Sequence, residues 1–289
     1  MTVNIEELRS LRVDDPGAIA RAAEARARRP LTGRMMLIAA DHPARGALAA
    51  RGQSAAMADR GELLARLVTA LARPGVDGVL GTPDIVEDLL LLGALDDKVV
   101  IGSMNRGGLA GSLFELDDRF TAYDVLSVAG MGLDGGKMLV RIALEDPATV
   151  RTLEHSARAV SALAAEGLMA MVEPFLSRWE DGKVVNDLSP DAVIKSMGIA
   201  SALGNTSRHT WLKIPVVEEM ERVMTATTLP TLLLGGDPKG SDEEVFASWG
   251  RALGLPGVRG LVVGRSLLFP RNDDVAAAVD IAAGLVAGS

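Results

Sequence analysis

Eight short apolar runs recur along this chain of 289 residues and constrain its fold more than any other feature. They are rich in Val, Ile, Leu and Met and mostly lack the alternation of a half-buried strand, as is typical of parallel strands covered on both faces. Amphipathic stretches such as 61–72, 146–167 and 241–254 lie between them. The runs occupy residues 35–40, 77–80, 98–103, 137–142, 168–172, 211–216, 231–236 and 260–264.

Strands that alternate with helices eight times predict an α/β protein, a single (β/α)8 TIM barrel. An open doubly wound sheet is the alternative, but Asp41-His42-Pro43 follows the first run where a dinucleotide-binding sheet carries a glycine-rich fingerprint. Residues 5–28 read as helical, with a turn at 15–17. We therefore expect a helical extension over residues 1–30 and a barrel over residues 31–289. Ser241 and Glu244 have the spacing of a capping box at the last amphipathic stretch.

Composition argues against several classes of function. A net charge of −8, no concentrated basic segment and 3% aromatic residues are typical of proteins that do not bind nucleic acid. The chain has no cysteine, and its three histidines lack the spacing of metal ligands, so we expect no metal and no cofactor. No signal pattern opens the chain, and no run approaches the roughly 18 apolar residues of a membrane helix, which predicts a cytoplasmic protein without a membrane partner. The histidines are His42, His155 and His209.

Lys213 is the clearest candidate for chemistry. Only six of the 30 basic residues are lysines, and this one lies inside the apolar run 211–216. Burial and nearby cations lower the pKa of a lysine, which supplies the neutral amine that attacks a carbonyl carbon. The alternative is a structural ion pair across the barrel.

Most of the other polar candidates fall late in their runs, where a barrel places its active site, whereas Lys137 starts the fourth run. Glu173 closes the fifth run before Pro174, and could relay protons or simply pair with a lysine. Lys137 and Arg141 share one face of the fourth run and could bind substrate oxygens, although Lys137 could instead lie in an exposed loop. Asp41 follows the first run, where it could orient a hydroxyl group or cap the next loop.

The loops after the last two runs have the character of an anion site. Gly235-Gly236 and Gly264-Arg265 allow backbone N–H groups to approach an oxyanion, and an arginine adds a bidentate donor. Barrels often bind phosphate in these two loops. After the third run, Ser103, Asn105 and Arg106 could also reach a substrate.

Several segments resemble known aldolases. DGGKMLVRI, MVEPF and WLKIPVV are similar to strands of class I tagatose-bisphosphate aldolases and the related sulfofructose-phosphate aldolases. LIAADH, LLLGGDPK and GLVVGRSLLFP resemble archaeal-type class I fructose-bisphosphate aldolases. The resemblance spans roughly residues 34–270. The chain also looks like a divergent actinobacterial branch that is called deoxyribose-phosphate-aldolase-like and is associated with inositol breakdown.

The resemblance implies a metal-independent class I aldolase and a role for each matching residue. Lys213 matches the Schiff-base lysine, Glu173 the acid–base, Lys137 a second active-site lysine and Asp41 the first-strand aspartate. The residues that match the anion-binding region of these aldolases are Gly235, Gly236, Gly264 and Arg265. The implied substrate is a phosphorylated ketose or keto-acid sugar, such as a deoxy-phosphogluconate derivative, with dihydroxyacetone phosphate as one product. The implied assembly is a homo-oligomer.

The chain departs from these families in two places. Archaeal-type enzymes use a tyrosine in acid–base work, and the only tyrosine here, Tyr123, precedes the fourth run. Arg141 stands in the stretch where the tagatose enzymes carry tyrosines. Two further functions stay open: a phosphosugar isomerase without a covalent step, and a catalytically silent metabolite sensor.

Overall fold

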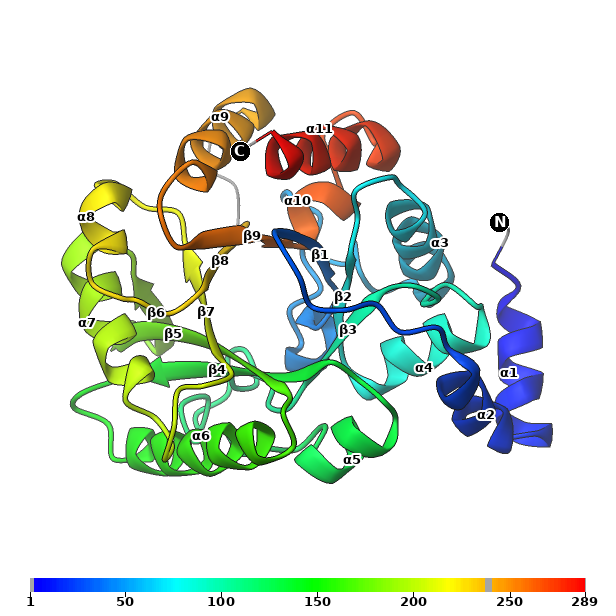
Figure 1. Cartoon of the computed structure of the whole chain (residues 1–289), viewed down its shortest axis with the longest axis horizontal. Coiled ribbons are helices and arrows are strands. Elements are labelled where there is room, and N and C mark those ends of the chain that lie inside the picture. The colour runs from blue at the N-terminus through cyan, green and yellow to red at the C-terminus, as the bar shows by residue number, and fades with distance from the viewer. Residues whose placement is uncertain (1–2, 237–240, 289) are drawn as a thin grey trace.

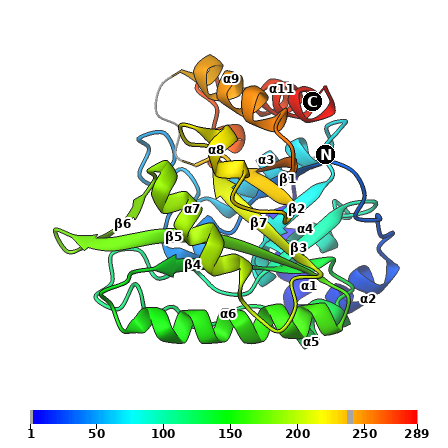
Figure 2. The same ribbon diagram turned by 60° about the vertical axis from the view of Figure 1, so that its left-hand side comes forward.

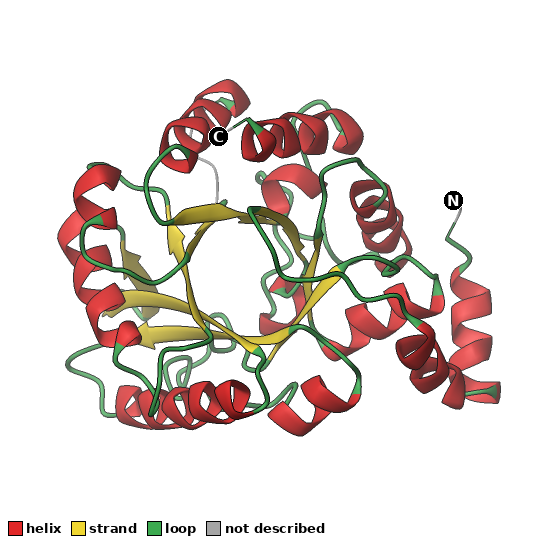
Figure 3. Cartoon of the chain, in the orientation of Figure 1, coloured by secondary structure: helices red, strands yellow, loops and turns green. Residues whose placement is uncertain are grey.

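A closed ring of eight parallel strands forms the centre of the molecule in the computed structural model, which describes residues 3–236 and 241–288 (Figures 1 and 3). Hydrogen-bonded neighbours follow the order β4-β3-β2-β1-β9-β8-β7-β5, and β5 pairs with β4 again. The barrel is therefore confirmed and the open sheet is wrong. The strands are β1 (Met35–Ala39), β2 (Gly78–Gly81), β3 (Val99–Ser103), β4 (Gly135–Ile142), β5 (Met169–Glu180), β7 (Thr210–Pro215), β8 (Thr231–Leu234) and β9 (Val258–Val263).

Helices cover the outside of the ring (Figure 3). The predicted capping box is present, because Ser241 and Glu244 cap each other's backbone at the start of α9. No helix among the described residues is both long and apolar enough to cross a membrane. The outer helices are α3 (Arg60–Leu71), α4 (Pro83–Leu91), α5 (Val125–Gly130), α6 (Ala148–Ala165), α7 (Pro190–Ser201), α8 (Met220–Met224), α9 (Asp242–Leu253), α10 (Arg265–Leu268) and α11 (Val275–Ala287), with a 3-10 turn, η1 (His42–Arg45).

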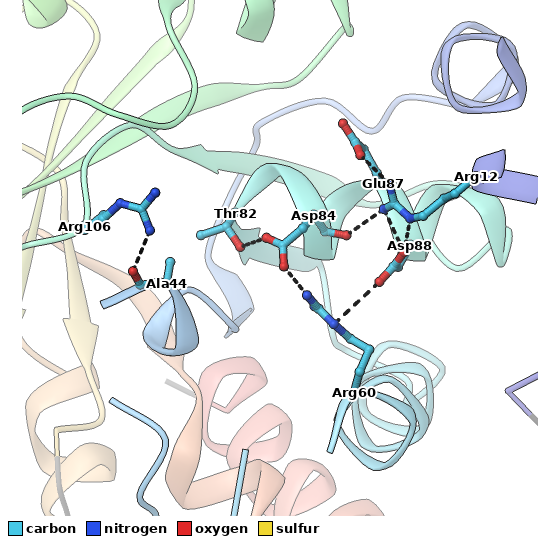
Figure 4. Close-up of polar contacts among 8 residues, drawn as sticks. All are labelled: Arg12, Ala44, Arg60, Thr82, Asp84, Glu87, Asp88 and Arg106. Atoms are coloured by element: carbon cyan, nitrogen blue, oxygen red, sulfur yellow. Dashed lines mark hydrogen bonds and ion pairs between the residues drawn. The ribbon is translucent and has the colours of Figure 1, made fainter. Parts of the chain in front are cut away.

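Two helices precede the barrel, α1 (Ile5–Asp14) and α2 (Gly17–Ala25), and lie at one side of it beside α4 (Figure 1). Arg12 joins α1 to α4 through ion pairs with Asp88 at 2.7 Å and Glu87 at 3.0 Å (Figure 4). Arg26, just after α2, is 2% exposed and lies 3.6 Å from the carboxylate of Asp134. The helical extension is thus present and attached by ion pairs.

The fifth strand differs from the prediction, because Glu173 does not end it. β5 continues to Glu180 and turns back into an antiparallel strand, β6 (Lys183–Asp187), which makes a hairpin that projects from the barrel (Figure 2). Pro174 lacks a hydrogen-bond donor, but its fixed φ is compatible with an extended chain, so it excludes a helix without ending the strand. Asp181-Gly182 at the tip, both with positive φ, is the usual signal of a tight hairpin.

Side chains of one parity fill the interior of the ring. Apolar side chains fill the part of the interior toward the amino ends of the strands. Three more apolar side chains, Leu139, Phe175 and Leu234, form a cluster toward the carboxyl ends. Polar side chains also point into the ring at the carboxyl ends of the strands. The apolar residues toward the amino ends are Met35, Leu37, Ala39, Leu80, Val99, Ile101, Met169, Met171, Leu232 and Val262.

Candidate active site

Four polar side chains from four strands meet at the carboxyl end of the barrel. The Lys213 amine on β7 lies 3.0 Å from Oε2 of Glu173 on β5. The Lys137 amine on β4 lies 2.7 Å from the same oxygen and 2.8 Å from Oδ2 of Asp41, which follows β1. The exposed-loop alternative for Lys137 is wrong, because this residue is 3% exposed and lies within β4.

Lys213 has the altered acidity that a lysine nucleophile requires. Burial lowers its pKa by disfavouring the charged form, Glu173 acts in the opposite direction, and the positive charge of Lys137 lowers the pKa further. The net direction is downward. The neutral amine of Lys213 is therefore more populated at a given pH than that of an exposed lysine.

The other three groups stay charged. Burial opposes the charge of Lys137, but Asp41 and Glu173 outweigh it and raise its pKa. Burial also opposes ionisation of Glu173, but Lys137 and Lys213 outweigh it and lower its pKa to about 2. Burial raises the pKa of Asp41, but the positive charge of Lys137 and the other nearby cations outweigh it and lower this pKa overall. At neutral pH the site holds two carboxylates, one fixed ammonium and one amine that titrates more readily.

These groups open into a cavity of about 550 Å³ between the strand ends. Six cationic side chains line it against two carboxylates, although the chain as a whole has a net charge of −8. A cavity of this charge attracts an anionic ligand. The cations are Arg45, Arg106, Lys137, Arg141, Lys213 and Arg265, and the carboxylates are Asp41 and Glu173. A second, wide-open hollow lies on the outer face of α6 beside the loop that follows α7, away from these groups.

The predicted anion loops line one side of the cavity. Gly235, Gly236, Gly264 and Arg265 all contribute to its wall. Close packing explains two of the glycines. A Cβ on residue 235 would lie 2.5 Å from the Val263 side chain, and a Cβ on residue 264 would lie 2.2 Å from the carbonyl oxygen of Ala39. The Arg265 guanidinium is half-buried, and its Nε is buried without a hydrogen-bond partner among the described residues.

A second group of charged side chains surrounds Arg141 on β4 and includes two residues that the sequence analysis missed, Arg45 and Glu115. Arg141 is buried, lines the cavity and pairs with the buried carboxylate of Glu115. Arg45, from η1, also lines the cavity. Both missed residues lie in irregular segments, where no periodicity shows which way a side chain points. The composition offered one signal for Arg45, the excess of Arg over Lys among the 30 basic residues.

The structure separates the remaining candidates. Tyr123 is buried against Gly102 on the outer face of β3 and does not line the cavity. Asn105 bonds the backbone of Leu139, so it supports β4 rather than a ligand. His42 lines the cavity, and burial with nearby cations lowers its pKa to about 3, which keeps its imidazole neutral.

Comparison with known proteins places the chain in a family. The model of the Cgl0159-like family matches residues 33–283. The chain belongs to this family. The crystal structure of Cgl0159 from Corynebacterium glutamicum is 58% identical, with a TM-score of 0.96 over 98% of this chain and 97% of that one. No curated protein matches the chain.

Members of the Cgl0159-like family share their fold with more distant aldolases. An archaeal fructose 1,6-bisphosphate aldolase is 20% identical, with a TM-score of 0.64 over 94% of this chain and all of that one. A fructose-bisphosphate aldolase from Slackia heliotrinireducens is 15% identical, with a TM-score of 0.59 over 94% and 89%. The expected resemblance to archaeal-type aldolases is confirmed for the fold.

Proposed function

We propose that this protein is a class I aldolase that makes or breaks a carbon–carbon bond through a Schiff base on Lys213. The observation that carries the proposal is the Lys213 amine, with its lowered pKa, 3.0 Å from an ionised Glu173 inside a cation-rich cavity. One of the distant structural relatives is an archaeal fructose-1,6-bisphosphate aldolase whose catalytic lysine is bound to a carbinolamine intermediate. This relative supports the assignment by analogy of fold.

In the cleavage direction, the neutral Lys213 amine attacks the ketone carbon and forms a carbinolamine. Loss of water gives an iminium ion, which is the electron sink for the reaction. A carboxylate then removes the proton from the hydroxyl group two carbons away, the carbon–carbon bond breaks, an aldehyde leaves, and the electron pair forms an enamine. Protonation of the enamine and hydrolysis release the second product and the free lysine.

Glu173 and Asp41 divide the proton transfers in this scheme. Glu173 lies beside the nucleophile, so it can return a proton to the carbinolamine hydroxyl and assist the loss of water. Asp41 contacts the Lys137 amine and also lines the cavity, so it is the proposed acceptor of the substrate hydroxyl proton. Lys137 stays cationic and holds both carboxylates in the ionised state.

The proposed substrate is a phosphorylated ketose or keto-acid sugar, with dihydroxyacetone phosphate as one product. The six cations of the cavity support an anionic ligand, and Arg265 with its glycine loops is the proposed phosphate site. A role in sugar or inositol catabolism, the cytoplasmic location and a homo-oligomeric state remain predictions from the sequence.

Borohydride trapping tests the covalent step. The protein is incubated with dihydroxyacetone phosphate, reduced, digested and mapped by mass spectrometry. We expect an adduct on Lys213 in the wild type and none at this position in Lys213→Met. Folded protein that forms no adduct with this ketone or with a panel of phosphorylated ketoses would contradict the proposal, and would favour the isomerase or the silent sensor.

A further inference from the structure

The hairpin of β5 and β6 has an outer edge that no strand covers. It projects from the barrel (Figure 2), and β6 is the last strand in the order of the sheet. Among the residues that the structure describes, β5 is its only strand neighbour, and four of its five residues are partly exposed. A two-stranded hairpin alone is marginally stable in water, and a free edge is a template for pairing with another chain. The edge therefore needs either protection or a partner.

The turn of the hairpin decides which backbone groups face outward. A two-residue turn makes the residues on either side of it, Glu180 and Lys183, a hydrogen-bonded pair. This pattern alternates along antiparallel strands, so the N–H and C=O groups of Val184 and Asn186 point away from β5. Within the described part of the chain, no backbone hydrogen bond from outside the hairpin reaches these four groups.

The sequence of β6 is complementary to itself when a second copy of it runs antiparallel. A register centred on Val185 places Val184 opposite Asn186 of the second copy, so that outward-facing groups meet on both sides of the centre. The same register places Lys183 opposite Asp187 of the second copy. Opposite charges on facing residues stabilise a strand pair, and side chains lie closest in a non-hydrogen-bonded pair such as this one.

Neighbouring registers lose this match. A register centred one residue earlier would place Asp187 opposite Asp181 of the second copy, which are both negative. A register centred one residue later would place Lys183 opposite Ser189, which has no charge. Only the register centred on Val185 therefore uses the whole of β6 and balances its charges.

The two charged residues of β6 are available for such a contact. Neither forms an ion pair with another described residue. The Asp187 carboxylate accepts the N–H of Ser189 at 2.9 Å through Oδ1, which leaves Oδ2 for a second donor. A lysine on a free edge usually prevents pairing, but here an aspartate of the second copy would balance its charge.

We propose that a second copy of this chain pairs with β6 about a twofold axis at Val185 and joins the two hairpins into a four-stranded sheet. A twofold interface uses the same surface of both copies, which requires the self-complementarity that β6 has. Trp179 and Leu188, which are 38% and 50% exposed, add apolar area to the hairpin. Asn186 and Leu188 also line the cavity, so the joined sheet supports one wall of each candidate site.

A single cysteine tests the register, because the chain has none of its own. In Val185→Cys the two cysteines meet at the axis with their Cα atoms about 4.5 Å apart, which suits a disulfide. Lys183→Cys is the matched control, since its Cα atoms would lie roughly 14 Å apart across the axis. Under mild oxidation, Val185→Cys should form covalent dimers at least about tenfold faster than Lys183→Cys. Equal rates would overturn the proposal.

A charge swap tests the ion pair. In sedimentation equilibrium, Lys183→Glu should raise the dissociation constant of the wild-type dimer by about tenfold or more, because the repulsion occurs twice in the interface. Adding Asp187→Lys to the same chain should restore the dimer. Arg158→Glu makes the same change of charge on the outer surface of α6 and should have no effect. Thermal unfolding confirms that each variant is folded.

Three results would reject the interface. They are a wild-type protein that stays monomeric at all concentrations, a dimer that Lys183→Glu does not weaken, and a folded double variant that stays monomeric. Borohydride trapping on Lys213 does not depend on any of them, so this proposal and the proposed aldolase can fail separately.

Discussion

At the residue scale, a single carboxylate oxygen organises the candidate site. Oε2 of Glu173 contacts both lysine amines, at 2.7 and 3.0 Å, yet the two lysines differ in acidity. Lys137 has Asp41 as a second carboxylate partner and a raised pKa, whereas Lys213 has no such direct contact and a lowered one. The difference between the two amines therefore comes from Asp41.

The pH dependence of trapping follows from these directions. Only the neutral amine reacts, so imine formation is lost as pH falls through the lowered pKa of Lys213. Glu173 raises that pKa, and Glu173→Gln should therefore move the midpoint of the trapping rate to lower pH. Initial trapping rates measured across pH in both proteins check this. A midpoint that moves to higher pH would contradict the electrostatic account.

The two lysines should also differ in their effect on stability. The lowered pKa of Lys213 means that its charge opposes folding below the unfolded pKa, so Lys213→Met should be neutral or stabilising. Lys137→Met leaves Asp41 and Glu173 buried without their main partner and should cost about 3–5 kcal/mol. Urea unfolding of both variants at pH 7 measures the difference. Equal losses would show that the two amines are equivalent.

At the element scale, close approach of neighbouring strands sets the shape of the ring. Gly260 on β9 has a φ of +132°, and a Cβ there would lie 1.8 Å from the Met35 oxygen on β1. No other residue type fits this position without moving a strand. This contact lies at the amino end of β1, away from the candidate site.

Substitution of this glycine should destabilise the fold. Gly260→Ala should cost about 3 kcal/mol or more, because backbone atoms cannot yield as a flexible side chain can. Gly198→Ala is the matched control, since Gly198 lies in α7 with open space around its Cβ position, and should stabilise by about 0.5–1 kcal/mol. Thermal unfolding of both variants compares them. Similar midpoints would show that β9 can shift away from β1.

Most elements of this fold were predictable from the sequence, and the exceptions have physical reasons. Buried parallel strands are continuous apolar runs, so all eight were found, and seven of them lie within a few residues of their observed bounds, whereas β5 continues to Glu180. β6 was missed because its five residues include only two valines, Val184 and Val185, and all five are exposed or partly exposed, as is expected of a hairpin outside the core. Their places in the strands and the resemblance to aldolases brought Lys137, Glu173 and Lys213 together in advance. Arg45 and Glu115 escaped notice because loop geometry has no period.

At the scale of the whole molecule, the candidate site and the attachment of the N-terminal helices lie at opposite ends of the barrel. The candidate site lies at the carboxyl ends of the strands. Arg26 lies near their other end, where it donates 2.6 Å hydrogen bonds to the carbonyl oxygens of Lys98 and Gly132. This arginine connects the N-terminal helices to the segments that lead into β3 and β4.

Removal of Arg26 should therefore weaken the fold without changing the site. Arg26→Ala leaves Asp134 buried beside unpaired carbonyl groups and should cost about 3 kcal/mol. Arg9→Ala, which removes an exposed ion pair within α1, should cost less than about 0.5 kcal/mol. Unfolding curves of both variants check this, together with the borohydride trapping rate divided by the amount of folded protein. A change in trapping that exceeds the loss of folded protein would connect the two ends of the barrel.

The shared oxygen of Glu173 has a consequence for how this family could change its chemistry. Two amines on different strands already touch the same carboxylate, and one aspartate keeps the second amine protonated. With Lys213 as the proposed nucleophile, Lys137 becomes a second candidate that a single substitution could release. In Asp41→Asn we expect peptide mapping to find borohydride adducts on Lys137 as well as Lys213, while adducts on Lys213 alone would show that Lys137 is inaccessible. Schiff-base barrels could in this way move their reactive lysine from one strand to another without passing through an inactive ancestor.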